Sequence, residues 1–352
     1  MNILNAKTAL DKIINKARVH LYKPIQIAEI LYKFRTQNGI DLEKLETYRT
    51  QSRKWRDIIC VEFLGRTSTS SARYQDDVFN ENAVPPEAIL ALGQENNKKN
   101  GIVEAYIYRR FQARFSQLSI GVQYCMNQDM NSFQLEDFIN KFWNEPGLRR
   151  SIDKVYEIVV YSLLSTVVEA IDLKVDIYYD QSKTDILYEF DNFSEKILGF
   201  DDSIKKLTIS GKINRGGVTN AADRGLDMWA NFGLAIQVKH LSLTEELAED
   251  IVNSVTADRI IIVCRSSEKK VIISLLNQLG WKSRIQSIIT ETELISWYET
   301  ALRGRFSSIT GQKLLENIIN ELIAEFPSTN TKDFDRFIKA RNYDKLLDNI
   351  WT

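Results

Sequence analysis

Apolar positions recur with helical spacing through the first third of the chain. Leu10, Ile13 and Ile14 lie at the i, i+3, i+4 spacing of one helix face. Pro24 suits the first turn of a second helix, because a proline there loses no helical hydrogen bond. Asp41 suits the N-cap of a third helix that begins at Leu42. The N-terminal region is therefore predicted to be mostly helical.

Two breaks in this pattern divide the chain. Residues 65–100 are rich in Ser, Thr, Asn and Asp and contain two adjacent prolines, which predicts loop or irregular structure. An amphipathic helix is expected at 133–143, and a Pro-Gly pair soon after it marks the end of the helical region. We therefore predict two domains, one over residues 1–145 and one over residues 146–352.

From residue 151 onward, strand patterns and helix patterns follow one another. A helix over 151–170 is apolar nearly all round, as a buried helix is. Strands are predicted at 173–179, 206–213, 225–231, 234–241, 258–265 and 284–290, and helices at 242–255 (with Ser242 as a possible cap), 271–280, 291–302 and from 309 to the end. This order favours an α/β fold, with one mixed central β-sheet flanked by helices and preceded by the helical region.

Composition limits the chemistry. The 352 residues are 44% hydrophobic and 26% charged, the composition of a globular protein with a sizeable core. The formal net charge of −1 does not point to a polyanionic partner, so any contact with nucleic acid must come from local clusters. Three scattered cysteines indicate a reducing compartment without disulfides or a structural zinc site, and two histidines nearly exclude histidine-based metal sites. With neither a signal peptide nor a membrane-length apolar run, we expect a cytoplasmic protein with no membrane partner.

Two polar residues interrupt the apolar strand "LAIQVKHL". Gln237 and Lys239 are two residues apart, so they share one face of the strand, while Ile236 and Val238 share the other. One interpretation is an amphipathic strand whose polar face is exposed to solvent. The other is a buried strand whose polar pair takes part in chemistry.

An acid upstream favours the second interpretation. Asp227 lies ten residues before Gln237, and the intervening "NFG" can form a turn, so a hairpin would bring Asp227 beside Gln237 and Lys239. A carboxylate and an amide oxygen suit a hard cation such as Mg²⁺. A neighbouring lysine can orient an attacking water or stabilise charge that develops on a phosphate. Asp223 is a rival ligand, but it precedes a glycine and fits a loop better.

A further acid lies within the apolar helix. Glu157 has apolar neighbours on its own face, and a lone buried carboxylate is costly unless it is paired or binds a metal. Alternatively, the side chain reaches solvent from a partly exposed stripe. Glu169 lies twelve residues further on, about 120° around the helix, so these two acids are not expected to serve one metal.

These residues resemble a known pattern. An acidic helix, a strand with Asp, a turn and a strand ending in acid-x-Lys are similar to the PD-(D/E)XK nuclease superfamily, here in the form with glutamine in place of the second acid. More closely, "GGVTNAADRGLDMWANFGLAIQVKHLSL", "GRTSTSSARYQDDVF" and the chain length resemble the HaeII restriction endonuclease family. The resemblance implies that Glu157, Asp227, Gln237 and Lys239 form the catalytic site, with Glu157, Asp227 and Gln237 as ligands of Mg²⁺. The neutral Gln237 departs from the commoner motif and lowers the negative charge of the metal site.

Basic residues provide candidate contacts with DNA. The stretch from 203 to 222 contains no acid and leads straight toward Asp227, and its cations suit phosphate contacts, which fix register without reading sequence. A solvated loop is the competing interpretation. Arginines of the polar loop after residue 65 are candidates for reading guanine. The candidate DNA-binding residues are Lys205, Lys206, Lys212, Arg215, Arg66 and Arg73.

The leading hypothesis is a type II restriction endonuclease. We predict that residues 1–145 recognise DNA and dimerise and that residues 146–352 form the nuclease. The resemblance implies that both strands of a purine-GCGC-pyrimidine (RGCGCY) palindrome in double-stranded DNA are cut, and we expect a cognate DNA methyltransferase as a functional partner. One candidate site and no internal repeat predict a homodimer, because a palindrome has two-fold symmetry. The alternatives are a non-cutting DNA-binding protein with a nuclease-like fold, and a repair or modification-directed nuclease.

Overall fold

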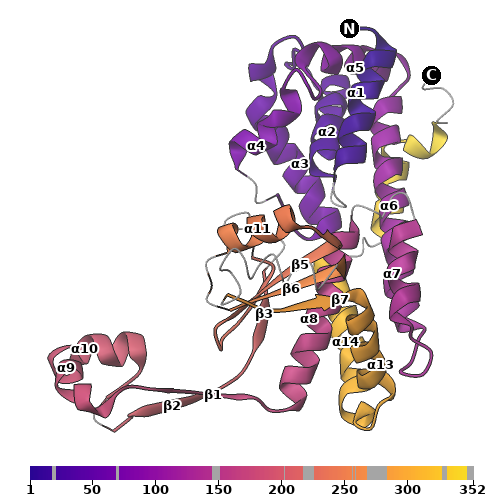
Figure 1. Cartoon of the computed structure of the whole chain (residues 1–352). Helices are drawn as coiled ribbons and strands as arrows, with labels where there is room; N and C mark the ends of the chain where they lie inside the picture. The colour runs from indigo at the N-terminus through magenta and orange to yellow at the C-terminus, as the bar shows by residue number, and fades with distance from the viewer. Residues whose placement is uncertain are drawn as a thin grey trace.

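The fold is described from a computed structural model of the chain, which is drawn in Figure 1. The structure describes residues 1–17, 21–68, 71–144, 151–201, 203–216, 226–255, 257, 259–267, 284–326 and 331–346. The helix predicted at 271–280 and the rival ligand Asp223 both lie outside these residues. Within the described part of the chain, no helix is both long enough and apolar enough to span a membrane.

Helices form the N-terminal part of the molecule, as the sequence predicted. They are α1 (Ile3–Lys16), α2 (Tyr22–Thr36), α3 (Arg49–Leu64), the short α4 (Ala72–Asp76), α5 (Pro86–Lys98) and α6 (Ile102–Met126). Their apolar faces meet in one cluster that includes Leu10, Ile27 and Ile89. The third helix begins at Arg49 and not at Leu42, because the Asp41 carboxylate accepts the Glu43 backbone N–H in a local turn before a short 3₁₀ segment.

The prediction of irregular structure over 65–100 was wrong for its second half. Helix α5 begins at Pro86, where a proline costs nothing because the first helical N–H groups have no intrahelical partner. Ala88, Ile89 and Leu92 are fully buried on its inner face. The proline pair therefore marks the start of a helix and not a loop.

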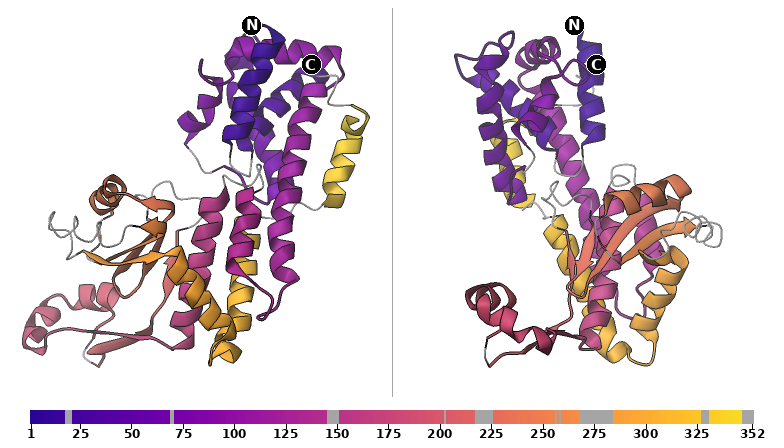
Figure 2. Two further views of the ribbon diagram at one scale, coloured as in Figure 1. Left: turned by 45° about the vertical axis from the view of Figure 1, so that its right-hand side comes forward. Right: turned by 60° about the vertical axis from the view of Figure 1, so that its left-hand side comes forward.

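The C-terminal segment returns to the N-terminal helices. Helix α15 (Thr331–Ala340) and the 3₁₀ turn Tyr343–Lys345 place Phe334 and Tyr343 in the N-terminal apolar cluster. Figure 2 shows α15, in yellow, among these helices. Helix α6 in turn contributes Phe111 to this cluster and Cys125 to a second apolar cluster, which consists mainly of residues of the C-terminal half. Apolar packing therefore crosses residue 145 in both directions, and the division into domains 1–145 and 146–352 stays a prediction.

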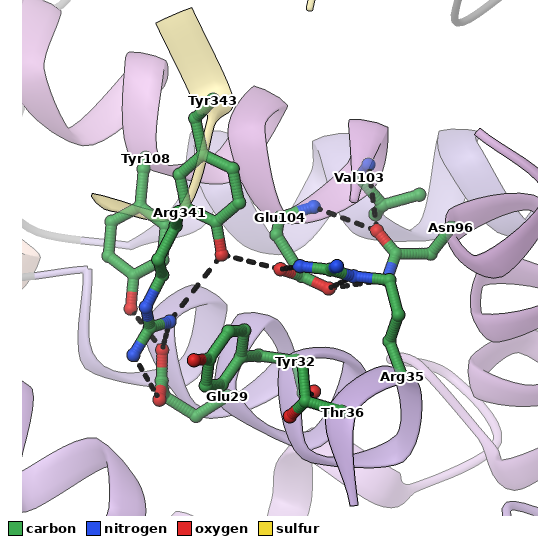
Figure 3. A network of polar contacts seen from close by, with 10 residues as sticks. All are labelled: Glu29, Tyr32, Arg35, Thr36, Asn96, Val103, Glu104, Tyr108, Arg341 and Tyr343. Carbon is green, nitrogen blue, oxygen red and sulfur yellow. Dashed lines mark hydrogen bonds and ion pairs between the residues drawn. The ribbon is translucent and has the colours of Figure 1, made fainter. Parts of the chain in front are cut away.

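Two buried carboxylates anchor this C-terminal segment (Figure 3). Arg341 donates to both oxygens of Glu29, at 2.6 and 3.2 Å, and its guanidinium lies 3.6 Å from the centre of the Tyr32 ring. The fully buried Glu104 is held by Arg35, at 3.0 and 2.9 Å, and accepts the Tyr343 hydroxyl. Each buried charge thus has a bidentate arginine, the arrangement that makes burial of a carboxylate tolerable.

The C-terminal half contains the mixed five-stranded sheet that the sequence predicted. Its order is β3-β4-β5-β6-β7, where β3 pairs with β4 and β4 with β5 antiparallel, and the remaining pairs are parallel. The strands are β3 (Ile213–Arg215), β4 (Met228–Ala230), β5 (Leu234–Leu243), β6 (Ile260–Ser267) and β7 (Ile285–Thr290).

Helices cover both faces of the sheet (Figure 1). On one face, Ile236 and Val238 pack in a cluster with residues of α7 (Leu135–Asn144), α8 (Ile152–Ala170), α13 (Glu291–Arg303) and α14 (Ser307–Glu325). On the other face, Ala235 packs with residues of α11 (Glu245–Ser254). The side chains of β5 therefore alternate between faces as predicted. The cap of α11 is Thr244 and not Ser242, whose hydroxyl pairs with that of Ser266.

Two predicted strands do not join the central sheet. β1 (Lys174–Tyr178) and β2 (Lys206–Ser210) form a separate antiparallel ribbon. At its far end lie α9 (Thr184–Glu189), α10 (Asp191–Phe193) and one π-helical turn (Ser194–Leu198). Local pattern predicted the strands correctly, but it does not specify which strand each one pairs with.

We predict that Arg341→Ala lowers the free energy of unfolding by roughly 3–5 kcal/mol, because Glu29 then keeps a buried charge without its partner. Denaturant unfolding measures this. Arg336→Ala is the matched control, since Arg336 lies five residues earlier, on α15, and is 80% exposed in its pair with Asp333. Equal stabilities of the two variants would contradict the anchoring role of Arg341.

Candidate active site at the end of strand β4

Asp227 lies directly opposite Gln237. Met228 is paired with Ile236 in the antiparallel β4–β5 ladder, and one further step along the two strands aligns Asp227 with Gln237. The Gln237 amide Nε2 donates to Asp227 Oδ2 at 2.5 Å, and the Val238 backbone N–H donates to the same oxygen at 2.8 Å. The structure therefore brings together the acid and the amide that the hairpin prediction placed side by side.

The side-chain oxygen of Gln237 is a hydrogen-bond acceptor that no donor reaches among the described residues. The Gln237 side chain is 3% exposed, and its Oε1 has no hydrogen-bond partner among the residues that the structure describes. A buried, unpaired carbonyl oxygen is costly, and such groups usually have a specific explanation. An oxygen ligand for a hard cation is one explanation, because the cation supplies the positive partner that the protein omits. The donor set of Gln237 and Asp227 thus fits Mg²⁺.

Glu157 lies inside the protein and does not reach solvent from the helix. It is 6% exposed on α8, and the Lys154 ammonium, one turn earlier, donates to both carboxylate oxygens at 2.8 and 2.6 Å. Burial raises the pKa of Glu157 to about 7; Lys154 opposes the shift, and the Asp227 charge adds to it. The two acids are therefore close enough to repel each other, as groups that share one site do.

Lys239 lies near Asp227 and is half-buried on β5. Burial raises the pKa of Asp227, while the Val238 N–H, Lys239 and Lys154 lower it. The buried carboxylate of Glu157 and the half-buried carboxylate of Asp227 therefore lie beside two ammonium groups and one neutral amide. All four predicted site residues lie in one region of the structure.

Lys154 is a site residue that the sequence interpretation missed. The signal was its i, i+3 spacing to Glu157 in "DKVYE", which places both side chains on one helix face. Glu169, by contrast, is 54% exposed and pairs with Lys313 at 3.7 Å, so it is not a buried carboxylate like Glu157. This position agrees with the expectation that Glu169 and Glu157 do not serve one metal.

No larger cluster of metal-ligand residues is present in the part of the chain that the structure describes. There, no group of three or more His, Cys, Asp and Glu side chains is placed to hold a metal ion. Two of the proposed ligands are carboxylates, Glu157 and Asp227, and the third ligand oxygen comes from the Gln237 amide. Its low count of acids follows directly from the glutamine on β5.

The candidate DNA-binding residues differ in how exposed they are and in what they contact. Arg73, Lys205 and Lys212 are exposed, and so is Lys206, which pairs with Asp176 on the neighbouring strand of the ribbon at 2.8 Å. They belong to separate elements: Arg73 lies on α4, Lys205 directly precedes β2, which begins at Lys206, and Lys212 precedes β3.

Arg215 and Arg66 serve internal contacts. The Arg215 side chain is 8% exposed and is held by Glu321 and Glu325 of α14, at 2.7 and 3.0 Å. Arg66 donates to the backbone carbonyl of Glu325. These placements favour a structural role, in which both arginines join other elements to the end of α14, over a contact with phosphate.

Comparisons with known proteins agree on one family. The family model described as HaeII restriction endonuclease matches residues 6–343. The chain is 59% identical to the type II restriction enzyme HaeII of Haemophilus aegyptius over 343 residues, 97% of each chain. It is 56% identical to the type II restriction enzyme NgoBI of Neisseria gonorrhoeae over 340 residues, 96% of each chain. No solved structure matches it.

The raised pKa of Glu157 predicts a pH-dependent stability. A carboxyl whose folded pKa lies above its unfolded value of 4.5 stabilises the fold in its neutral form, and this stability is lost as the pH rises through about 7. We expect Glu157→Gln to stabilise the metal-free protein more at pH 8 than at pH 5, by about 2 kcal/mol.

Denaturant unfolding at the two pH values in a chelator measures this difference. Glu169→Gln is the control, because it makes the same change on the same helix at a side chain that is 54% exposed. A gain from Glu157→Gln that is the same at both pH values would contradict the buried, neutral carboxyl.

Proposed function

Since this chain belongs to the HaeII restriction endonuclease family and is therefore a site-specific deoxyribonuclease, we propose that it cuts both strands of a purine-GCGC-pyrimidine (RGCGCY) palindrome by Mg²⁺-dependent hydrolysis. The proposed catalytic site consists of Glu157, Asp227, Gln237 and Lys239. The observation that carries this assignment is the unpaired Gln237 Oε1, buried beside the carboxylate of Asp227.

Three oxygen-bearing residues would hold the cation: Asp227, Gln237 and Glu157. When bound, Mg²⁺ supplies a Lewis acid that polarises the scissile phosphate and offsets its negative charge. The protein contributes the shape of the site: the Val238 N–H and the Gln237 amide fix one Asp227 oxygen, and Lys154 fixes Glu157. A preorganised ligand set of this kind needs little rearrangement on binding.

Lys239 has a different role in this proposal. Its ammonium lies close enough to Asp227 to lower the pKa of that carboxyl, and it lies two residues from Gln237 along β5. It can donate to the attacking water and to the phosphate oxygens, where negative charge develops during hydrolysis. Lys154, bound to both oxygens of Glu157, positions that carboxylate and is not assigned to the substrate.

The alternatives differ in what supports them. Family membership in a class of site-specific deoxyribonucleases leaves no support for a non-cutting DNA-binding protein. Both relatives are named type II restriction enzymes, which favours sequence-directed cleavage over a modification-directed or repair nuclease. We further propose a cytoplasmic homodimer whose host carries a cognate methyltransferase for the same site, because an unprotected genome would be cut.

A cleavage assay tests the function. A plasmid with one RGCGCY site is incubated with the protein in Mg²⁺, and the ends are mapped; an otherwise identical plasmid without the site is the control. Linear DNA with ends at the site supports the proposal. Cleavage that ignores the site, or cleavage that is unchanged in chelator, would contradict the proposed sequence or the proposed metal.

We predict that Lys239→Ala lowers the cleavage rate by about 10²-fold or more, the effect expected from removing a donor that acts on developing charge. Folding and binding to a cognate duplex in Ca²⁺ should stay close to those of the wild type. Lys44→Ala, at a side chain that is 75% exposed in the N-terminal region, is the control. A wild-type rate for Lys239→Ala would show that the polar face of β5 is structural.

Gln237 offers a test of metal binding that does not depend on cleavage. Gln237→Glu adds a charge beside Asp227 and should tighten Mg²⁺ or Mn²⁺ binding to the DNA-free protein, whereas Gln237→Met keeps the volume but removes the oxygen and should weaken it. Calorimetric titration at pH 8 measures both changes, each expected to be about tenfold or more. Unchanged affinity in both variants would exclude Gln237 as a ligand.

A further inference from the structure

A protruding arm is the part of the structure that the proposed site does not explain. We use "arm" for residues 172–211, which comprise the β1–β2 ribbon and the helices at its tip. Figures 1 and 2 show the ribbon leading away from the central sheet, with α9 and α10 at its far end. Both strands have the same pattern of exposure, with four of their five residues exposed. The ribbon therefore projects from the protein without a covering layer.

The arm exposes an unusual amount of apolar surface. Six large apolar side chains on it are more than half exposed: Tyr178, Ile186, Tyr188, Phe190, Phe193 and Ile197. Its own core is small, with Phe200 packed against Tyr179 at a ring-centroid distance of 5.3 Å. An isolated two-stranded ribbon is marginally stable in water, and large exposed apolar patches mark interaction surfaces. Such a surface needs a partner that covers it.

Charge decides what kind of partner fits. The arm has nine Asp and Glu residues and five Lys, a formal charge of −4, so the rest of this −1 chain carries +3. An acidic surface repels the phosphates of DNA, which argues against the nucleic acid as the natural cover and against the phosphate contacts expected of Lys205 and Lys206, both on the arm. Two arms packed against each other would repel as well. The body of a second copy is both a protein surface and of opposite charge.

The arm is also attached at both ends to elements of the candidate site. Helix α8, which carries Glu157, leads into β1, and β2 leads through Gly211 and Lys212 into β3, which pairs with β4 next to Asp227. A partner that holds the arm therefore fixes the position of its own body relative to this site. Such a contact is suited to holding two sites in a constant relation.

We propose that the arm binds the body of a second copy of this chain, so that two chains exchange arms about a two-fold axis. This inference rests on the proposed function for its symmetry, because concerted cutting of a palindrome needs two sites related by such an axis. Each protomer gives one arm and receives one, which buries both apolar patches and pairs each acidic arm with a basic body.

Sedimentation velocity of the full chain tests this, with and without a cognate duplex. The arm variant carries Tyr188→Gln, Phe193→Gln and Ile197→Gln. Its matched control carries Trp297→Gln, Phe306→Gln and Ile309→Gln, three side chains outside both the arm and residues 1–145 that are 41%, 62% and 60% exposed. We expect a dimer for the wild type and the control, and dimerisation at least about tenfold weaker for the arm variant. A wild-type monomer on DNA, or an arm variant that dimerises normally, would overturn the proposal.

The assay on a plasmid separates this inference from the proposed function. An arm variant that retains intact sites should release nicked circles where the wild type releases linear DNA. If the wild type does not cut, the proposed function is wrong, but sedimentation still tests whether the arm is required for dimerisation. If the arm variant stays dimeric but loses DNA binding, the arm contacts DNA and the inference is wrong.

A crosslinking experiment covers the case in which the arm variant does not fold. The native cysteines Cys60, Cys125 and Cys264 are buried, so Tyr178→Cys introduces a reactive thiol that a photo-crosslinker can label selectively. Mixing isotopically heavy and light chains distinguishes crosslinks between copies from those within one. Crosslinks from the arm to the body of the other copy support the proposal; crosslinks confined to one chain, or joining arm to arm, contradict it.

Discussion

The candidate site depends on where strand β4 ends. β5 continues beyond its last antiparallel partner, so the Val238 N–H has no strand to receive it, and the Asp227 carboxylate takes the place of the missing backbone carbonyl. That hydrogen bond, with the one from Gln237 Nε2, holds one carboxylate oxygen and turns the amide so that its Oε1 is left without a donor. A longer β4 would pair these groups within the sheet and leave no ligand set.

The protein buries carboxylates in two different ways, and the difference separates structure from chemistry. Glu29 and Glu104 each receive a bidentate arginine, which neutralises the charge and satisfies both oxygens. Glu157 is instead held by the ammonium of Lys154, and Asp227 by an amide and one backbone N–H, and burial raises the pKa of both. A buried carboxylate whose charge is fully neutralised by an arginine is tolerated in the fold. Two neighbouring carboxylates whose charge is only partly neutralised can still bind a cation.

Local pattern predicted what depends on local physics. The alternation along β5, the burial of α8 and the approach of Asp227 to Gln237 all follow from side-chain period and a short turn, and the structure shows each of them. The pairing of β1 with β2, apart from the central sheet, was not predictable in this way, because strand sequences do not specify their partners. Arg215 illustrates the same limit. It lies in a stretch that contains three lysines and no acid, but Glu321 and Glu325, which pair with it, lie more than one hundred residues away.

Net charge is informative only when it is divided by position. The total of −1 gave no sign of an interacting partner, yet the arm and the rest of the chain carry −4 and +3. Charges of opposite sign within one chain usually attract and fold together, but the arm projects away from the remainder of its own chain (Figure 2). The apolar side chains of the arm are exposed because the rest of its own chain does not cover them. A segment whose charge and apolar surface both remain unmatched within its own copy is matched most simply by the body of a second copy, and two copies that each give and receive one arm have the two-fold symmetry that one site per chain requires.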